Sequence, residues 1–168
     1  MFKQPFAIAV LISLAGAVPF LALCAIVLLD PLASPTAIEV LISYGAVILS
    51  FTGAVHWGFA LRDTAHPMNG TTLPPATLGA ERQLLVYGTV PAIIGWVALS
   101  VMLHFNAPAL ALFLLLAGFF ITVVVETIGR GRGVVAANYL ALRWGVSIIV
   151  LLVLVAVLLA VLTGMRVG

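Results

Sequence analysis

His56 is the side chain of this sequence best placed to do chemistry, because it lies within residues 44–58, which read YGAVILSFTGAVHWG. This stretch is apolar enough to cross a membrane, yet it also carries Tyr44, Thr52 and Trp57. Ionisable side chains are costly in hydrocarbon, so a histidine there raises the question of a function by default. The roles open to it are ligation of a haem or metal, binding of a small molecule, and hydrogen bonding between helices.

The three histidines do not combine into a haem or metal site. His56 lies six residues before Arg62, which marks the membrane boundary at the end of the predicted span. At the rise of an α-helix this places His56 about 9 Å inside that boundary. His104 lies near the opposite surface, so the two are about 20 Å apart across a core about 30 Å thick. His66 is followed by Pro67 in a polar loop and makes a poor axial ligand. Zinc needs three or four ligands, and none lies at helical spacing from His56. We therefore expect no resident cofactor and no metal.

Packing between helices is the first interpretation of His56. Polar side chains in membrane bundles form contacts between helices of about 0.6 kcal/mol on average, and small residues let two helices approach closely. A polar and small-residue face on this helix and a small-residue stripe on the next span predict a close contact between the two. These residues are Gly45, Ala46, Leu49, Thr52, Gly53, His56 and Trp57 on one helix, and Gly88, Ala92 and Gly95 on the other.

A ligand pocket is the second interpretation, since charged residues gather at the same ends of the predicted spans. We predict that Glu126 pairs with Arg143 or Arg62, because ionisable groups near hydrocarbon pair or reach the headgroups. The simpler account is control of topology and anchoring, with Trp144 at the headgroup level. The alternative is a polar cluster above His56 that suits the head group of a quinone or a phospholipid. The candidate ligand-binding residues are Tyr44, Thr52, His56, Trp57, Arg62, Glu126 and Arg143.

The elements that must position these residues are membrane-spanning helices. The 168 residues are 64% hydrophobic and only 7% charged, and the mean hydropathy is +1.32, whereas soluble domains carry about 25% charged residues. We predict an all-α bundle of five transmembrane helices in a single domain, 1–168, with a polar loop over 62–83 and a polar linker over 126–138. The predicted spans are 6–29, 38–61, 84–103, 109–125 and 142–163.

The charges of the loops predict an orientation. With five spans, six of the seven basic residues fall on one side and only Arg166 on the other. Basic residues in short loops mark the cytoplasmic face, so we expect a cytoplasmic N-terminus and a periplasmic C-terminus. The basic residues are not clustered on one surface, which argues against a nucleic-acid partner. The single cysteine, Cys24, excludes an intramolecular disulfide.

Residues 44–58 resemble the signature segment of a family of bacterial inner-membrane proteins that includes mitochondrial transmembrane protein 69. Two further segments agree with it: YGTVPAIIGW at 87–96, and NYLALR at 138–143 leading into the last span. The resemblance covers residues 38 to the end of the fifth span, and it implies no catalytic residue. It does imply an energy-transducing membrane. Because the N-terminus enters the first span almost at once, we expect the bacterial inner membrane.

Together these observations favour a protein without enzymatic activity, since no catalytic set of side chains converges on one face. We expect an accessory or assembly subunit of a larger membrane complex, with a respiratory complex as the candidate. Its partners would be the lipid bilayer and a membrane protein or further copies of itself. The alternative is a protein that binds a quinone or a lipid in an inner-leaflet pocket near His56. A transporter is disfavoured by the odd number of spans and the lack of an inverted repeat.

Overall fold

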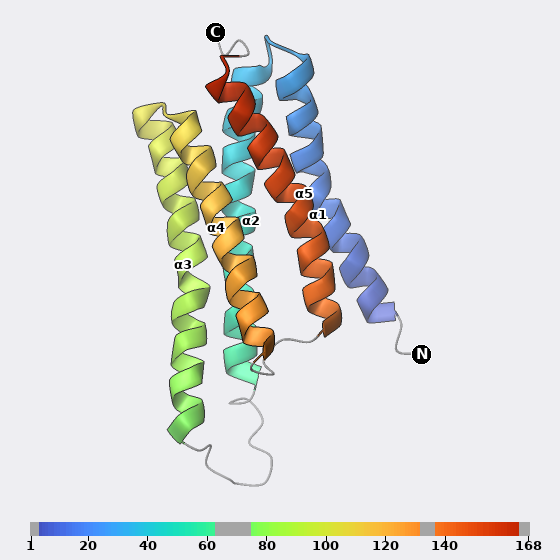
Figure 1. Cartoon of the computed structure of the whole chain (residues 1–168), viewed down its shortest axis with the longest axis vertical. Coiled ribbons are helices and arrows are strands. Elements are labelled where there is room, and N and C mark those ends of the chain that lie inside the picture. The colour runs from blue at the N-terminus through green and yellow to red at the C-terminus, as the bar shows by residue number, and fades with distance from the viewer. Residues whose placement is uncertain (1–3, 63–74, 132–136, 165–168) are drawn as a thin grey trace.

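A computed structural model describes residues 4–62, 75–131 and 137–164 of the chain (Figure 1). Within these residues all regular structure is helical. The helices are α1 (Gln4–Leu29), α2 (Ser34–Arg62), α3 (Pro75–Phe105), α4 (Pro108–Gly131) and α5 (Ala137–Leu162).

All five helices are long and apolar enough to cross a membrane, which confirms the predicted fold class. The apolar stretches are Ala7–Leu29, Ser34–Gly58, Leu85–Phe105, Pro108–Ile128 and Ala141–Leu162. Large hydrophobic side chains face outward along the helices, among them Leu11, Val47 and Leu152. An outward apolar surface of this kind is the surface that contacts the lipid bilayer.

Two predicted loop boundaries were wrong. The segment 62–83 was predicted to be too broken for a helix, yet α3 begins at Pro75, eight residues before the end of that segment. Proline is tolerated in the first turn because its missing N–H is one of the groups that have no partner there. The linker was predicted to start at Glu126, but α4 continues to Gly131. Glu126 stays in the helix because its charge is paired inside the bundle.

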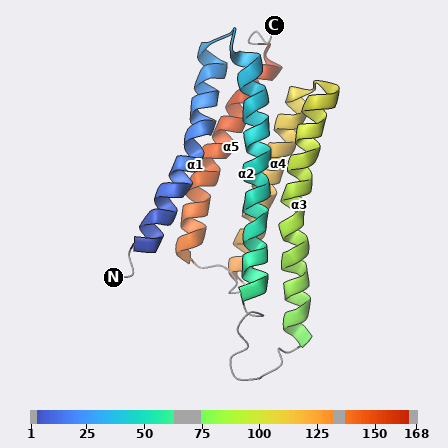
Figure 2. The same ribbon diagram turned by 180° about the vertical axis from the view of Figure 1, so that it is seen from behind.

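The helices form a ring in chain order that closes between α5 and α1, and α2 and α4 also contact each other across it. In Figure 1, α3 lies at one edge of the bundle and α1 and α5 at the other, with α2 and α4 between them. Figure 2 shows α2 and α3 side by side from behind. The start of α1 and the end of α5 lie at opposite ends of the bundle, as an odd number of spans requires.

Short turns join the helices at the end of the bundle where α1 finishes. Asp30 accepts hydrogen bonds from the backbone N–H groups of Leu32 and Ala33 at 3.0 and 3.2 Å, which fixes the turn before α2. The predicted tight turn before the fourth span is confirmed, since α3 ends at Phe105 and α4 starts at Pro108. Asn106 between them has a φ of 46°, a left-handed conformation that asparagine tolerates.

Close contact between α2 and α3 confirms the prediction from the small-residue stripes. A Cβ atom added at Gly53 would overlap the carbonyl oxygen of Gly88, and one added at Gly95 would lie 2.8 Å from the carbonyl oxygen of Ala46. The stripe of α2 is nevertheless divided between neighbours. A Cβ atom at Gly45 would lie 2.9 Å from Leu115 of α4, so this glycine serves the contact between α2 and α4.

Candidate functional site

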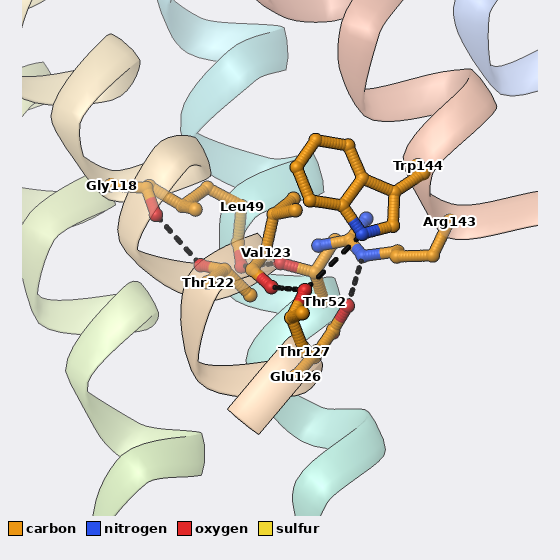
Figure 3. Close-up of polar contacts among 9 residues, drawn as sticks. All are labelled: Leu49, Thr52, Gly118, Thr122, Val123, Glu126, Thr127, Arg143 and Trp144. Atoms are coloured by element: carbon orange, nitrogen blue, oxygen red, sulfur yellow. Dashed lines mark hydrogen bonds and ion pairs between the residues drawn. The ribbon is translucent and has the colours of Figure 1, made fainter. Parts of the chain in front are cut away.

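A buried ion pair joins α4 to α5. The Nε–H of Arg143 donates to Oε2 of Glu126 at 2.9 Å, and the two side chains are 11% and 0% exposed (Figure 3). This is one of the two pairings predicted for Glu126, and the side chain of Arg62, the other predicted partner, lies outside the described residues. Buried ions are kept in low dielectric only when they are paired, so the pair accounts for a carboxylate at this depth of α4.

A hydrogen bond between Trp144 and Thr127 also joins α4 to α5, and each of these residues directly follows a member of the ion pair. The indole Nε1–H of Trp144 donates to Oγ1 of Thr127 at 3.2 Å, and the Thr127 hydroxyl donates to the carbonyl of Val123 at 2.7 Å. Figure 3 shows Arg143 and Trp144 reaching from α5 to α4 together. These two adjacent bonds fix the first turns of α5 against the last turns of α4.

The ion pair does not use all of its hydrogen-bonding capacity. Oε1 of Glu126, Nη2 of Arg143 and Oγ of Ser147 are buried, and none has a hydrogen-bond partner among the residues that the structure describes. Arg143 and Ser147 are four residues apart and share a face of α5. Buried polar atoms of this kind are costly, which makes them a marker of a functional site.

A cavity of about 250 Å³ lies between α1, α2 and α5, and Arg143 forms part of its wall. Its polar lining residues are Ser13, Thr52 and Arg143, while most of the remainder are apolar. The cavity lies towards the end of the bundle where α1 and α5 start and α2 finishes. The apolar and glycine lining residues are Ile12, Gly16, Phe20, Ile48, Phe51, Val55, Leu142, Val146 and Val150.

Two of the predicted site residues serve contacts between helices. The Tyr44 hydroxyl donates to the backbone carbonyl of Gly16 at 2.9 Å, which fastens α2 to α1. The indole Nε1–H of Trp57 donates to the carbonyl of Leu85 at 3.1 Å, which fastens α2 to α3. Both side chains therefore support packing.

Thr52 and His56, two further predicted residues, line different cavities on two sides of α2. Thr52 lines the 250 Å³ cavity with Arg143, and its hydroxyl donates to the carbonyl of Leu49 at 2.7 Å. His56 is 3% exposed and lines a different cavity of about 20 Å³ with residues of α3 and α4. Arg62 ends α2, but its side chain lies outside the described residues. The structure thus brings Thr52, Glu126 and Arg143 into one region and leaves His56 outside it.

Sequence reasoning missed the contribution of α1 to the cavity. Ser13, Gly16 and Phe20 come from a span that has almost no amphipathic pattern, so no periodicity marks which face turns inward. Phe20 is fully buried and makes edge-on contacts with Tyr44 and Phe119, with ring centroids 5.1 and 6.1 Å apart. In the described part of the chain no group of three or more His, Cys, Asp or Glu side chains is placed to hold a metal ion.

Comparison with known families now places the chain. A family described as "Protein of unknown function (DUF3429)" matches residues 6–159, which is nearly the whole chain. The chain belongs to this family. A relative of this DUF3429 protein, transmembrane protein 69 of Xenopus tropicalis, is 34% identical over 91 residues. That match covers 54% of this chain and 32% of the relative, so the chain spans about a third of the relative's length. Both findings confirm the predicted resemblance. No solved structure matches the chain.

Proposed function

We propose that this membrane protein binds a lipid-soluble small molecule in the cavity between α1, α2 and α5. The observation that carries the proposal is an apolar cavity whose wall includes Arg143, one partner of a buried ion pair. Binding sites for small molecules are mostly apolar and contain a few polar groups that fix orientation. Structural packing alone would favour filling this space with side chains, because interiors are close-packed.

The cavity has a route to the bilayer. Ile12 and Phe51 line it and are also 65% and 70% exposed, so its mouth lies on the surface that contacts lipid. A ligand can therefore enter sideways from the membrane, with its polar head near Arg143 and its apolar part near the mouth. This geometry favours a lipophilic molecule over a water-soluble one.

Filling the cavity is expected to expel the ligand. Gly16 lines the cavity, and a Cβ atom there would meet nothing within 4 Å, so Gly16→Phe adds a ring without a clash at its base. We expect the wild-type protein, purified in mild detergent, to retain a small molecule in native mass spectrometry, and Gly16→Phe to lose it.

The matched control is Gly145→Phe, since Gly145 is equally open but does not line the cavity. This control is expected to keep the ligand. A wild-type protein that carries no small molecule, or equal retention in both variants, would contradict the proposal.

An accessory role in a larger complex is the second candidate, and Trp96 favours it. Trp96 lies near the middle of the apolar stretch of α3 and is 68% exposed. Tryptophan in membrane proteins concentrates at the interfaces with water, so an exposed indole at mid-membrane suits a protein partner better than lipid. The same native mass spectra test this role, because a partner subunit would appear as added protein mass.

The orientation proposed from the loop charges puts the cavity in the cytoplasmic half of a bacterial inner membrane. Asn106, in the turn between α3 and α4, would then face the periplasm. In a Cys24→Ser background, Asn106→Cys is expected to react with a membrane-impermeant maleimide added to spheroplasts. Reaction only after the cells are permeabilised would reverse the orientation.

A further inference from the structure

We propose that the ligand of this cavity carries an electrically neutral head with a carbonyl-type acceptor on a flat ring, the chemistry of a membrane quinone, and not an anionic phosphate. This inference rests on the proposed function and names its ligand class. It follows from the neutralised charge of Arg143, from the hydrogen-bond donors that line the cavity and from the aromatic residues of the cavity wall.

The charge of the site argues for a neutral head. Arg143 is the one cationic side chain among the residues that line the cavity, and Glu126 already neutralises it through a bond of 2.9 Å. A phosphate would have to compete with a carboxylate that is fully buried and cannot move into water. Two anions sharing one guanidinium in low dielectric repel each other strongly, so the pair selects against anionic heads.

The donors of the site argue for an acceptor on the ligand. A guanidinium has five N–H donors, and Glu126 takes the one on Nε. The N–H groups of the two terminal nitrogens remain, and Arg143 is one of the residues that line the cavity. The Thr52 hydroxyl donates its hydrogen to the carbonyl of Leu49, so towards a ligand it can only accept a hydrogen bond. Arg143 and Ser13 are therefore the lining side chains that can donate to a carbonyl oxygen, and Arg143 is the charged donor of the two.

The wall of the cavity argues for a flat ring with an apolar tail. Phe20 and Phe51 both line the cavity, and aromatic faces favour offset or edge-on contact with another ring. Phe20 is fully buried and fixed by its contacts with Tyr44 and Phe119, so Phe51, which is 70% exposed, is the ring that a ligand can contact. A tail attached to such a ring leaves through the mouth at Ile12 and Phe51.

The test compares two probes in lipid nanodiscs made of phosphatidylcholine. One probe is a decyl-substituted benzoquinone, measured by quenching of tryptophan fluorescence, and the other is phosphatidylglycerol, measured by native mass spectrometry. We expect the wild-type protein to bind the quinone and phosphatidylglycerol not to compete with it. Gly16→Phe is expected to abolish binding and Gly145→Phe to leave it unchanged.

Two variants test separately whether Arg143 acts as a hydrogen-bond donor and whether the neutral charge of the site excludes anionic heads. The double substitution Glu126→Met with Arg143→Met removes the donor without leaving a buried charge, and quinone binding is expected to weaken by about tenfold or more. Glu126→Gln leaves Arg143 with a net positive charge, and phosphatidylglycerol is then expected to displace the quinone.

The outcomes distinguish this inference from the proposed function. Binding of phosphatidylglycerol but not of the quinone to the wild-type protein, abolished by Gly16→Phe, would overturn the neutral head and keep a ligand in the cavity. Unchanged quinone binding in the double methionine variant would overturn the role of Arg143. If neither probe binds and no molecule is retained after purification, the proposed function itself fails.

Discussion

Glu126→Ala is expected to lower the free energy of unfolding by about 3–5 kcal/mol, the cost of removing one partner from a buried ion pair. The substitution leaves the Arg143 guanidinium, whose side chain is only 11% exposed, without its carboxylate. The bond between α4 and α5 is lost with it, and the bond from Trp144 to Thr127 is then the side-chain hydrogen bond that remains between these two helices among the described residues. Reversible unfolding in mixed detergent and sodium dodecyl sulfate micelles measures the change.

The control for this prediction removes both charges. Glu126→Met combined with Arg143→Met replaces the pair with apolar side chains of similar length, and such replacements of buried pairs are often neutral. The double variant is therefore expected to recover most of the stability lost in Glu126→Ala. A single variant as stable as the wild-type protein would show that the pair contributes nothing to the fold. A double variant as unstable as the single one would locate the loss in packing.

Gly53→Val is expected to destabilise the contact between α2 and α3 by about 1–3 kcal/mol, the usual cost of overpacking a tight interface. A Cβ atom at Gly53 would overlap the carbonyl oxygen of Gly88, which is backbone and cannot rotate away. The helices must separate, and the bond from Trp57 to the carbonyl of Leu85 then lengthens or breaks. Unfolding in mixed micelles gives the free energy, and tryptophan fluorescence reports the change at Trp57.

Gly58→Val is the matched control, because Gly58 lies on the same helix and an added Cβ atom there meets nothing within 4 Å. It is expected to change stability by less than about 0.5 kcal/mol, as surface substitutions usually do. Equal effects at Gly53 and Gly58 would contradict a close contact at Gly53, since the loss would then reflect the presence of valine in the helix alone.

Much of the fold could be predicted because its causes are local. Spans of apolar residues have no stable place outside a bilayer, and each must satisfy its backbone internally as a helix. Small residues at helical spacing predicted the approach of α2 to α3. An ion pair of Glu126 with Arg143 or Arg62 was predictable as well, because a buried charge needs a counter-charge, and the structure shows Arg143 as the partner.

The candidate site could be predicted only in part. Residues 44–58 direct attention to His56, but a helix has several faces and the sequence does not say which neighbour each one meets. The structure turns Thr52 towards α1 and α5, and it turns His56 towards α3 and α4. The ligand proposed here therefore meets Arg143 and not the histidine.

The sequence by itself determined the solvent of this protein, the number of its helices and its family, since composition and local pattern are sufficient for these. Only the tertiary structure decided which polar groups share a cavity. The reason is that α1 has almost no amphipathic pattern, so its inward face is set by packing against α2 and α5. Gly16 and Phe20 acquire a role only when that packing leaves a space beside Arg143.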